Sequence, residues 1–250
     1  MSAALRTQAL SKSFGAFKAN SDISLSFEAG ARHALIGPNG AGKTTFINLL
    51  TGALAPTAGD VFLGEERVTD LSQHARVKRG MTRTFQINTL FPGLSVLESV
   101  VLAALEREGR GGVWWRRVSR ESAAIDEAGQ ILARLRLDRD ADTPTRALPY
   151  GKQRLLEIAL ALATRPRVLL LDEPAAGVPE DERRDILSAL AALPSDVAIL
   201  LIEHDMDLVF SFATRISVLL AGRLLTEGEP EAIAADERVR AVYLGEDAHG

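Results

Sequence analysis

The segment GPNGAGKT, residues 37–44, is the feature of this sequence that most constrains the fold. It follows the short apolar stretch HALI, which has the pattern of a buried strand, and leads into KTTFINLLTG, which has the pattern of a helix that ends at Gly52. The spacing G-x-x-x-x-G-K-[ST] between a strand and a helix is that of a phosphate-binding loop. The segment therefore predicts an α/β fold that binds a nucleotide.

Each part of this loop has a chemical role. Its glycines allow consecutive backbone N–H groups to turn toward an anion, and the N-terminus of the next helix carries a partial positive charge. Lys43 adds a full charge near the β- and γ-phosphates, and Thr44 adds a hydroxyl that can bind Mg²⁺. The residues expected to bind nucleotide here are Gly37, Pro38, Asn39, Gly40, Ala41, Gly42, Lys43, Thr44 and Thr45.

The segment VLLLDEP, residues 168–174, predicts the second half of the site. Its four apolar residues favour a buried strand, and Asp172 at the strand's end can hold Mg²⁺ with its water shell. Glu173 is placed to orient or deprotonate an attacking water. Alone, the pattern favours an apolar strand with an acidic turn, but the phosphate loop makes the catalytic interpretation the better one.

His204 follows the next apolar strand pattern, in LLIEHD. Parallel neighbours in a sheet end at the same edge, so this side chain is expected beside the γ-phosphate. The other histidines, His33, His74 and His249, are interpreted as structural.

Strand patterns alternate with helix patterns along most of the chain, which predicts an α/β fold with a mainly parallel sheet. An N-terminal antiparallel β subdomain is expected, with a hairpin around Gly64. The alternating segment DISLSFEAG predicts one strand. A helix-only block suggests an inserted α-helical subdomain. We expect one domain over 1–250, with the core and β subdomain at about 1–91 and 165–250 and the helical subdomain at about 92–164.

Composition narrows the function. The chain of 250 residues has a formal net charge of −4, so nucleic acid is not an expected partner. It has no cysteine, which excludes disulfide and thiolate chemistry. Its longest apolar runs are too short to span a bilayer, and no signal peptide is recognisable. A cytoplasmic protein is expected, with any membrane role arising through a partner.

In order along the chain, the phosphate loop, RTFQ, LPYGKQ, LLLDEP and IEHD resemble the motifs of ABC transporter ATP-binding subunits. With the closing VYLGE, they resemble more narrowly the subunits of branched-chain amino acid importers. The resemblance implies an ATPase with ATP and Mg²⁺ as cofactors, peripheral on the inner face of the cell membrane. It implies membrane permease subunits, a second ATP-binding subunit (identical or a sister) and, indirectly, a solute-binding protein as partners.

The resemblance also implies individual roles. Phe14 would stack on adenine, although a core phenylalanine is equally compatible with the sequence. Gln86 would sense Mg²⁺ or the attacking water. Glu173 would be the catalytic base, and His204 the γ-phosphate switch. Two copies would close head to tail, so that each ATP lies between one chain's phosphate loop and the other chain's signature.

The signature departs from the family's Leu-Ser-Gly-Gly-Gln, since residues 148–152 read LPYGK. Pro149 removes a hydroxyl and a backbone N–H, although proline suits a helix start. Gly151 keeps its N–H, and Lys152 adds a charge that can offset part of the loss. We interpret this as a working but altered signature in which Tyr150, Gly151 and Lys152 bind the partner's nucleotide.

Two further features concern partners. Pro179 stands where many relatives carry aspartate or asparagine, and it is expected to start the next helix while weakening communication across the dimer. The Trp- and Arg-rich stretch within 107–120 suits a membrane surface or permease loop, or simply a solvated loop.

Two alternative functions stay open at this stage. One is a soluble ABC-type switch acting on nucleic acid or ribosomes. The other is a weakly hydrolysing partner of a sister ATPase.

Overall fold

The computed structural model describes residues 3–84, 90–111 and 122–244, and the side chains of Asp181 and Leu244 are not described. It divides into two compact units, which are taken in turn. The first unit contains Met1–Met81, Arg167–Leu171 and Ser195–Gly250, and the second contains Thr82–Pro166 and Asp172–Pro194.

An antiparallel sheet opens the first unit, as the sequence predicts. Its strands are β1 (Ala3–Phe14), β2 (Phe17–Ile23), β3 (Ser26–Glu28), β5 (Ala58–Leu63) and β6 (Glu66–Arg67). Strand β1 pairs with β2, β3 and β5, and β5 pairs with β6 across the turn at Gly64. The hairpin prediction is therefore confirmed. The single strand predicted over DISLSFEAG is wrong, because β2 ends at Ile23 and β3 begins only at Ser26, so that Ser24 and Leu25 lie outside both strands.

A mainly parallel sheet follows, in the order β11-β10-β4-β9-β8-β7. Its strands are β4 (Arg32–Ile36), β7 (Met81–Arg83), β8 (Val168–Asp172), β9 (Ala198–Ile202), β10 (Arg215–Leu220) and β11 (Arg223–Gly228). Strand β4 pairs in parallel with both β9 and β10, whereas β11 is antiparallel to β10. Strands β8 and β9 are buried throughout, which explains why their sequences are continuous apolar runs instead of alternating ones.

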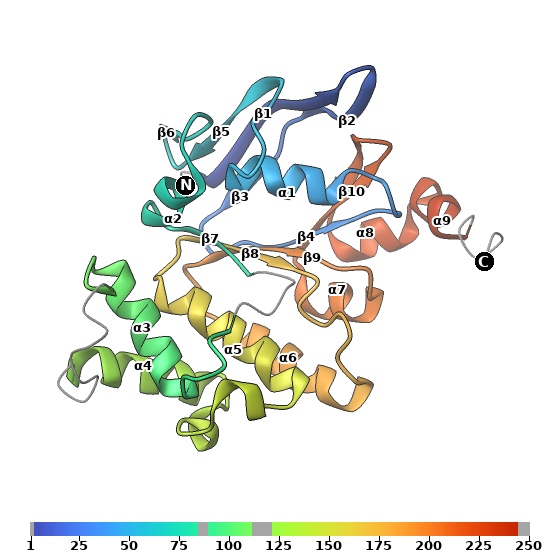
Figure 1. Ribbon diagram of the computed structural model, residues 1–250. Coiled ribbons are helices and arrows are strands. Elements are labelled where there is room, and N and C mark those ends of the chain that lie inside the picture. The colour runs from blue at the N-terminus through green and yellow to red at the C-terminus, as the bar shows by residue number, and fades with distance from the viewer. Residues whose placement is uncertain (1–2, 85–89, 112–121, 245–250) are drawn as a thin grey trace. The chain divides into compact units, whose positions relative to one another are not determined.

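Helices of the first unit are α1 (Lys43–Thr51), α2 (Gln73–Lys78), α7 (Met206–Phe212), α8 (Pro230–Ala235) and α9 (Glu237–Leu244) (Figure 1). The C-terminal segment PEAIAADERVRAVYLGE has the pattern of a single amphipathic helix. That helix is divided at Asp236, which has an extended backbone and ends α8.

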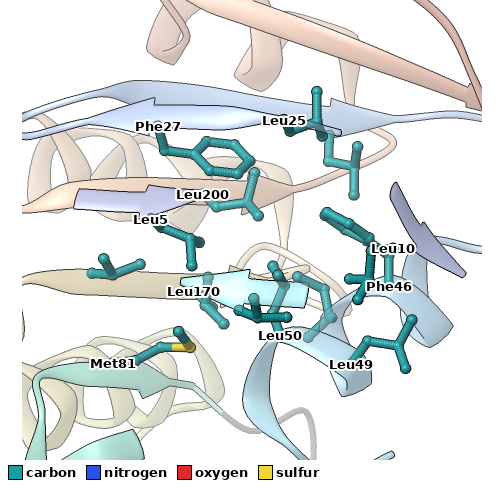
Figure 2. Close-up of a cluster of buried hydrophobic side chains, with 14 of the residues drawn as sticks. Leu5, Leu10, Leu25, Phe27, Phe46, Leu49, Leu50, Met81, Leu170 and Leu200 are labelled. Carbon is teal, nitrogen blue, oxygen red and sulfur yellow. The ribbon is translucent and has the colours of Figure 1, made fainter. Parts of the chain in front are cut away.

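The core of the first unit joins its two sheets through α1. Leu5 and Leu10 of β1 pack in the same buried cluster as Phe46 and Leu50 of α1 and Leu170 of β8 (Figure 2). All five side chains are fully buried. Since α1 begins at the phosphate loop, this packing fixes the helix that positions the loop.

The second unit is mainly helical. Its elements are α3 (Val96–Arg107), α4 (Ser122–Arg134), α5 (Tyr150–Ala163), α6 (Glu180–Ala191) and the 3₁₀ turns η3 (Asp138–Asp140) and η4 (Thr145–Ala147). Helix α3 starts with a capping box between Ser95 and Glu98. Arg107 at the other end of α3 donates to Glu127 of α4 and to the carbonyl of Ala163 at the end of α5. These bonds tie the ends of α3 and α5 to the middle of α4.

Within the described residues, every helix falls short of the length and apolarity needed to cross a bilayer. The two tryptophans of the Trp- and Arg-rich stretch lie outside the described residues, as does Gln86.

Candidate active site

The phosphate loop lies between β4 and α1. Its three glycines have left-handed or otherwise positive φ angles: 150° at Gly37, 77° at Gly40 and 98° at Gly42. Gly42 is the N-cap of α1, and because glycine has no side chain to cap the helix, the first N–H groups of α1 are left for another acceptor. This is the arrangement that suits an anion at a helix N-terminus.

The loop is supported on its far side by the backbone of neighbouring strands. A Cβ atom on Gly37 would lie 2.3 Å from the carbonyl oxygen of Leu219, and one on Gly42 would lie 2.5 Å from that of Ala19. The amide of Asn20 donates to Gly42 O at 3.2 Å, and Gly222 N donates to Ala41 O at 3.0 Å. At Gly37 and Gly42 these contacts leave no room for a side chain. They also hold the loop against the neighbouring strands without a ligand.

Lys43 extends along this loop. Its ammonium group donates to the carbonyl oxygens of Gly37 and, at 3.1 Å, of Pro38. Both acceptors are backbone groups of the loop itself, so the charge lies against the loop. Glycine-lined backbone, a helix N-terminus and a lysine are the donors that nucleotide phosphates require, and the residues present therefore fit the expected nucleotide.

Phe14, at the end of β1, has an exposed ring with the ammonium of Lys12 5.2 Å from its centre. The possibility that it is a core residue is therefore wrong. An exposed aromatic ring is available for stacking on a base, and adenine stacking at Phe14 stays a prediction.

The predicted catalytic acids lie at the end of β8. The Asp172 side chain is only 4% exposed and accepts a hydrogen bond from Arg83. Glu173, the next residue, has a φ of 48°, which is unusual for a residue with a side chain and typical of strained functional positions. The sequence did not indicate Arg83, because a lone arginine 89 positions before its partner carries no pattern.

His204 follows β9, and its side chain is 69% exposed. The carboxylate of the preceding Glu203, which is 1% exposed, accepts hydrogen bonds from the backbone N–H groups of His204 and Asp205. This holds the turn after β9 and leaves the imidazole at the surface. The γ-phosphate role of His204 stays a prediction, and so does that of Gln86.

The altered signature forms the start of α5, with Pro149 as its N-cap. The Tyr150 hydroxyl donates to Ala176 O at 3.3 Å and accepts from Arg154 at 2.7 Å. Gly151 N donates to a carboxylate oxygen of Glu182 at 3.0 Å. The signature is therefore bonded within its own unit to the segment that follows the predicted catalytic base.

Lys152 also has a partner within this unit. Its ammonium binds both carboxylate oxygens of Asp140, at 2.9 and 2.7 Å. A contact between Lys152 and a nucleotide stays a prediction, and it would require the lysine to leave this ion pair. Pro179 is the N-cap of α6 and not its first residue, a difference of one position from the sequence prediction.

No group of three or more acidic or histidine side chains suited to a metal ion occurs among the residues that the structure describes. This fits the chemistry of Mg²⁺, which uses one or two protein ligands plus phosphate oxygens and water. Thr44 and Asp172 have the required hydroxyl and carboxylate. They belong to different compact units, and their joint role as metal ligands stays a prediction.

Known proteins are similar to this chain in sequence and in fold. A family model described as ABC transporter matches residues 20–176, and one described as branched-chain amino acid ATP-binding cassette transporter matches residues 223–249. The high-affinity branched-chain amino acid transport ATP-binding protein BraF of Pseudomonas aeruginosa is 39% identical over 97% of this chain and 98% of its own length. LivG of Escherichia coli K12, with the same description, is 37% identical over 97% and 98%.

The fold also matches that of a solved structure. A crystal structure described as the ADP conformation of an ATP-binding cassette of an ABC transporter superposes with a TM-score of 0.86 and 30% identity, covering 98% of this chain and 99% of that one. The predicted fold class is thus confirmed, with its parallel core, antiparallel β part and helical part.

Proposed function

Because this chain belongs to the ABC transporter family of ATP-binding proteins, we propose that it hydrolyses ATP to drive an import system for branched-chain or related amino acids. The observation that carries the ATPase proposal is the phosphate loop, in which Gly37 and Gly42 pack against backbone, α1 begins without a side-chain cap, and the ammonium of Lys43 lies against the loop. The substrate class rests on the relatives' descriptions and on the match of residues 223–249.

In this proposal the loop's N–H groups and Lys43 bind the β- and γ-phosphates of ATP, and Phe14 stacks on the base. Thr44 and Asp172 hold Mg²⁺, which supplies charge neutralisation at the phosphates. Glu173 takes the proton of the attacking water, and Gln86 and His204 position water and γ-phosphate. The positive φ of Glu173 supports its role, since such strain persists where function requires it.

Two copies, or this chain and a sister subunit, would close head to tail with Tyr150 and Gly151 against the partner's nucleotide. The assembly would bind permease subunits on the cytoplasmic face of the membrane, and through them act on a solute-binding protein. Motion of the ATPase pair would then open and close the permeases. The solute itself would never contact this chain, so its identity is set by those partners.

The test is the mass of purified Glu173→Gln protein in solution, with and without Mg-ATP. We expect a monomer that becomes a dimer only with nucleotide, because the substitution removes the base but leaves every binding group. Lys43→Ala is the matched control, and it should neither bind ATP tightly nor dimerise. Glu173→Gln protein that never binds ATP would refute the proposal.

A monomer that binds ATP but never dimerises would instead indicate a sister subunit. The bonds that already hold Gly151 and Lys152 within their own unit are compatible with that outcome. Binding to DNA or RNA that weakens steeply with salt would favour a nucleic-acid switch, which the comparisons do not support.

A further inference from the structure

A buried ion pair joins the ends of strands β7 and β8, which are neighbours in the mainly parallel sheet. Arg83 is the last residue of β7, and its Nη2 atom lies 2.5 Å from Oδ2 of Asp172, the last residue of β8. The two side chains are 16% and 4% exposed. Water therefore screens this pair poorly, and the guanidinium compensates the charge of the buried carboxylate.

Arginine is a specific choice at this position. Its planar guanidinium presents N–H donors in a rigid fork that matches the geometry of a carboxylate. A cation of another kind must replace it, or the arginine must swing away while Asp172 receives new partners. Under the proposed function, the cation that approaches this carboxylate is Mg²⁺ on the nucleotide.

We propose that Arg83 is the counter-ion of Asp172 in the nucleotide-free chain and that Mg-ATP binding displaces it. The inference rests on the proposed role of Asp172 as a metal ligand. A guanidinium and Mg²⁺ bound to the same carboxylate repel each other at such short range, so each weakens the binding of the other. Arg83 thus keeps the buried carboxylate compensated before nucleotide arrives, and it lowers the affinity for the metal by the same competition.

The opposite role for Arg83 makes a different prediction. An arginine that only holds Asp172 in position for the metal would strengthen metal binding, and its removal would weaken it. An arginine that contacts the nucleotide phosphates directly would strengthen binding of metal-free nucleotide as well. The metal dependence of nucleotide affinity therefore separates the three roles.

The experiment is calorimetric titration of the full chain with AMP-PNP, a non-hydrolysable ATP analogue, in Mg²⁺ and in EDTA. The variants are Arg83→Met, which keeps much of the apolar stem and removes the charge, and Arg83→Lys, which keeps the charge. Arg79→Met is the matched control, because Arg79 pairs with Glu66 at the surface. Asp172→Asn tests the premise.

For Arg83→Met we expect Mg-AMP-PNP to bind about tenfold more tightly than to the unmodified chain, the scale of one neighbouring charge acting on a carboxylate. Binding in EDTA should not change, Arg83→Lys should lie near the unmodified chain, and Arg79→Met should match it. If Arg83→Met folds poorly without nucleotide, Arg83→Gln keeps a neutral donor to Asp172 and should show the same tightening.

Weaker or unchanged Mg-AMP-PNP binding in Arg83→Met, or a loss of binding confined to EDTA, would overturn the proposal. The premise that Asp172 binds the metal is tested independently by Asp172→Asn. If Asp172→Asn keeps the full advantage of Mg²⁺ over EDTA, Asp172 is not a metal ligand. If the unmodified chain binds no AMP-PNP under either condition, the proposed function itself is wrong.

Discussion

The backbone N–H of Gly151 donates a hydrogen bond of 3.0 Å to a carboxylate oxygen of Glu182. The donor is in the first turn of α5 and the acceptor in the first turn of α6, so a carboxylate lies at the partly positive N-terminus of the signature helix. A Cβ atom on Gly151 would come within 2.1 Å of that oxygen, so a larger residue here would have to displace the end of the Glu182 side chain. A partner's γ-phosphate that used this N–H would have to displace Glu182.

Neutralising Glu182 should therefore help the dimer to form. In the Glu173→Gln background, Glu182→Gln is expected to lower the ATP concentration for half-maximal dimerisation by about two- to fivefold, the scale of one charge at a helix N-terminus. The measurement is the mass in solution across an ATP titration. Glu180→Gln is the control, because Glu180 also lies in the first turn of α6 and is exposed. Equal effects of the two substitutions would place the cause in α6 itself and not in the bond to Gly151.

The phosphate loop offers a matched pair of glycine substitutions. Gly42→Ala places a Cβ 2.5 Å from the carbonyl oxygen of Ala19, whereas a Cβ on Gly40 meets nothing within 4 Å. Both residues have positive φ, so both substitutions cost about 1–2 kcal/mol of backbone strain. We expect Gly42→Ala to lose more stability than this and to abolish ATP binding, while Gly40→Ala keeps measurable binding. Denaturant unfolding and nucleotide titration of both variants check the pair, and equal losses would contradict it.

Arg76 closes the other end of α1. It is 1% exposed, and its guanidinium donates to the carbonyls of Leu49 and Leu50 in the last turn of α1 and to those of Thr69 and Leu71. Arg76→Met leaves these carbonyls without their donors and is expected to lower the free energy of unfolding by about 3 kcal/mol or more. Denaturant unfolding measures the loss. Lys78→Met on the exposed side of α2 should change stability by less than about 0.5 kcal/mol.

Local patterns were enough to predict most of the fold. The phosphate loop, the apolar strands β8 and β9 and the hairpin at Gly64 depend on neighbours within a few residues, and each is confirmed. The errors fall where the backbone turns without a sequence signal. Ser24 and Leu25 separate β2 from β3 although the apolar alternation continues through them, and Asp236 ends α8 in the middle of an amphipathic helix pattern.

Contacts of the candidate site between residues far apart in the sequence could not be predicted in the same way. The ion pair between Arg83 and Asp172 and the hydrogen bond from Gly151 N to Glu182 form only because the fold brings their elements together. Lys152 is a second case in which the sequence did not reveal a side chain's partner. The sequence indicated a charge available to nucleotide, and the structure places that charge on Asp140, whose position no local pattern reveals.

His33 makes stability depend on pH. The residue lies on β4, is 1% exposed, contacts the Phe27 ring edge-on and shares a hydrogen bond of 2.8 Å between Nε2 and the Ser217 hydroxyl. Burial, with a smaller contribution from the charge of Arg215, lowers the pKa of His33 to about 4 from its usual 6.5. Its structural role, expected from the sequence, is thus confirmed.

Because the pKa of His33 is lower in the folded chain, the unfolded chain binds more protons between pH 6.5 and 4. The stability that neutral His33 contributes is full above pH 6.5 and is lost as pH falls toward 4. From pH 7.5 to 5 the loss should be about 2 kcal/mol. His33→Gln, which cannot be protonated, should be less stable at pH 7.5 yet lose about 2 kcal/mol less than the unmodified chain on this change of pH. Denaturant unfolding of both proteins at the two pH values measures it, and parallel losses would show that other groups cause the acid sensitivity.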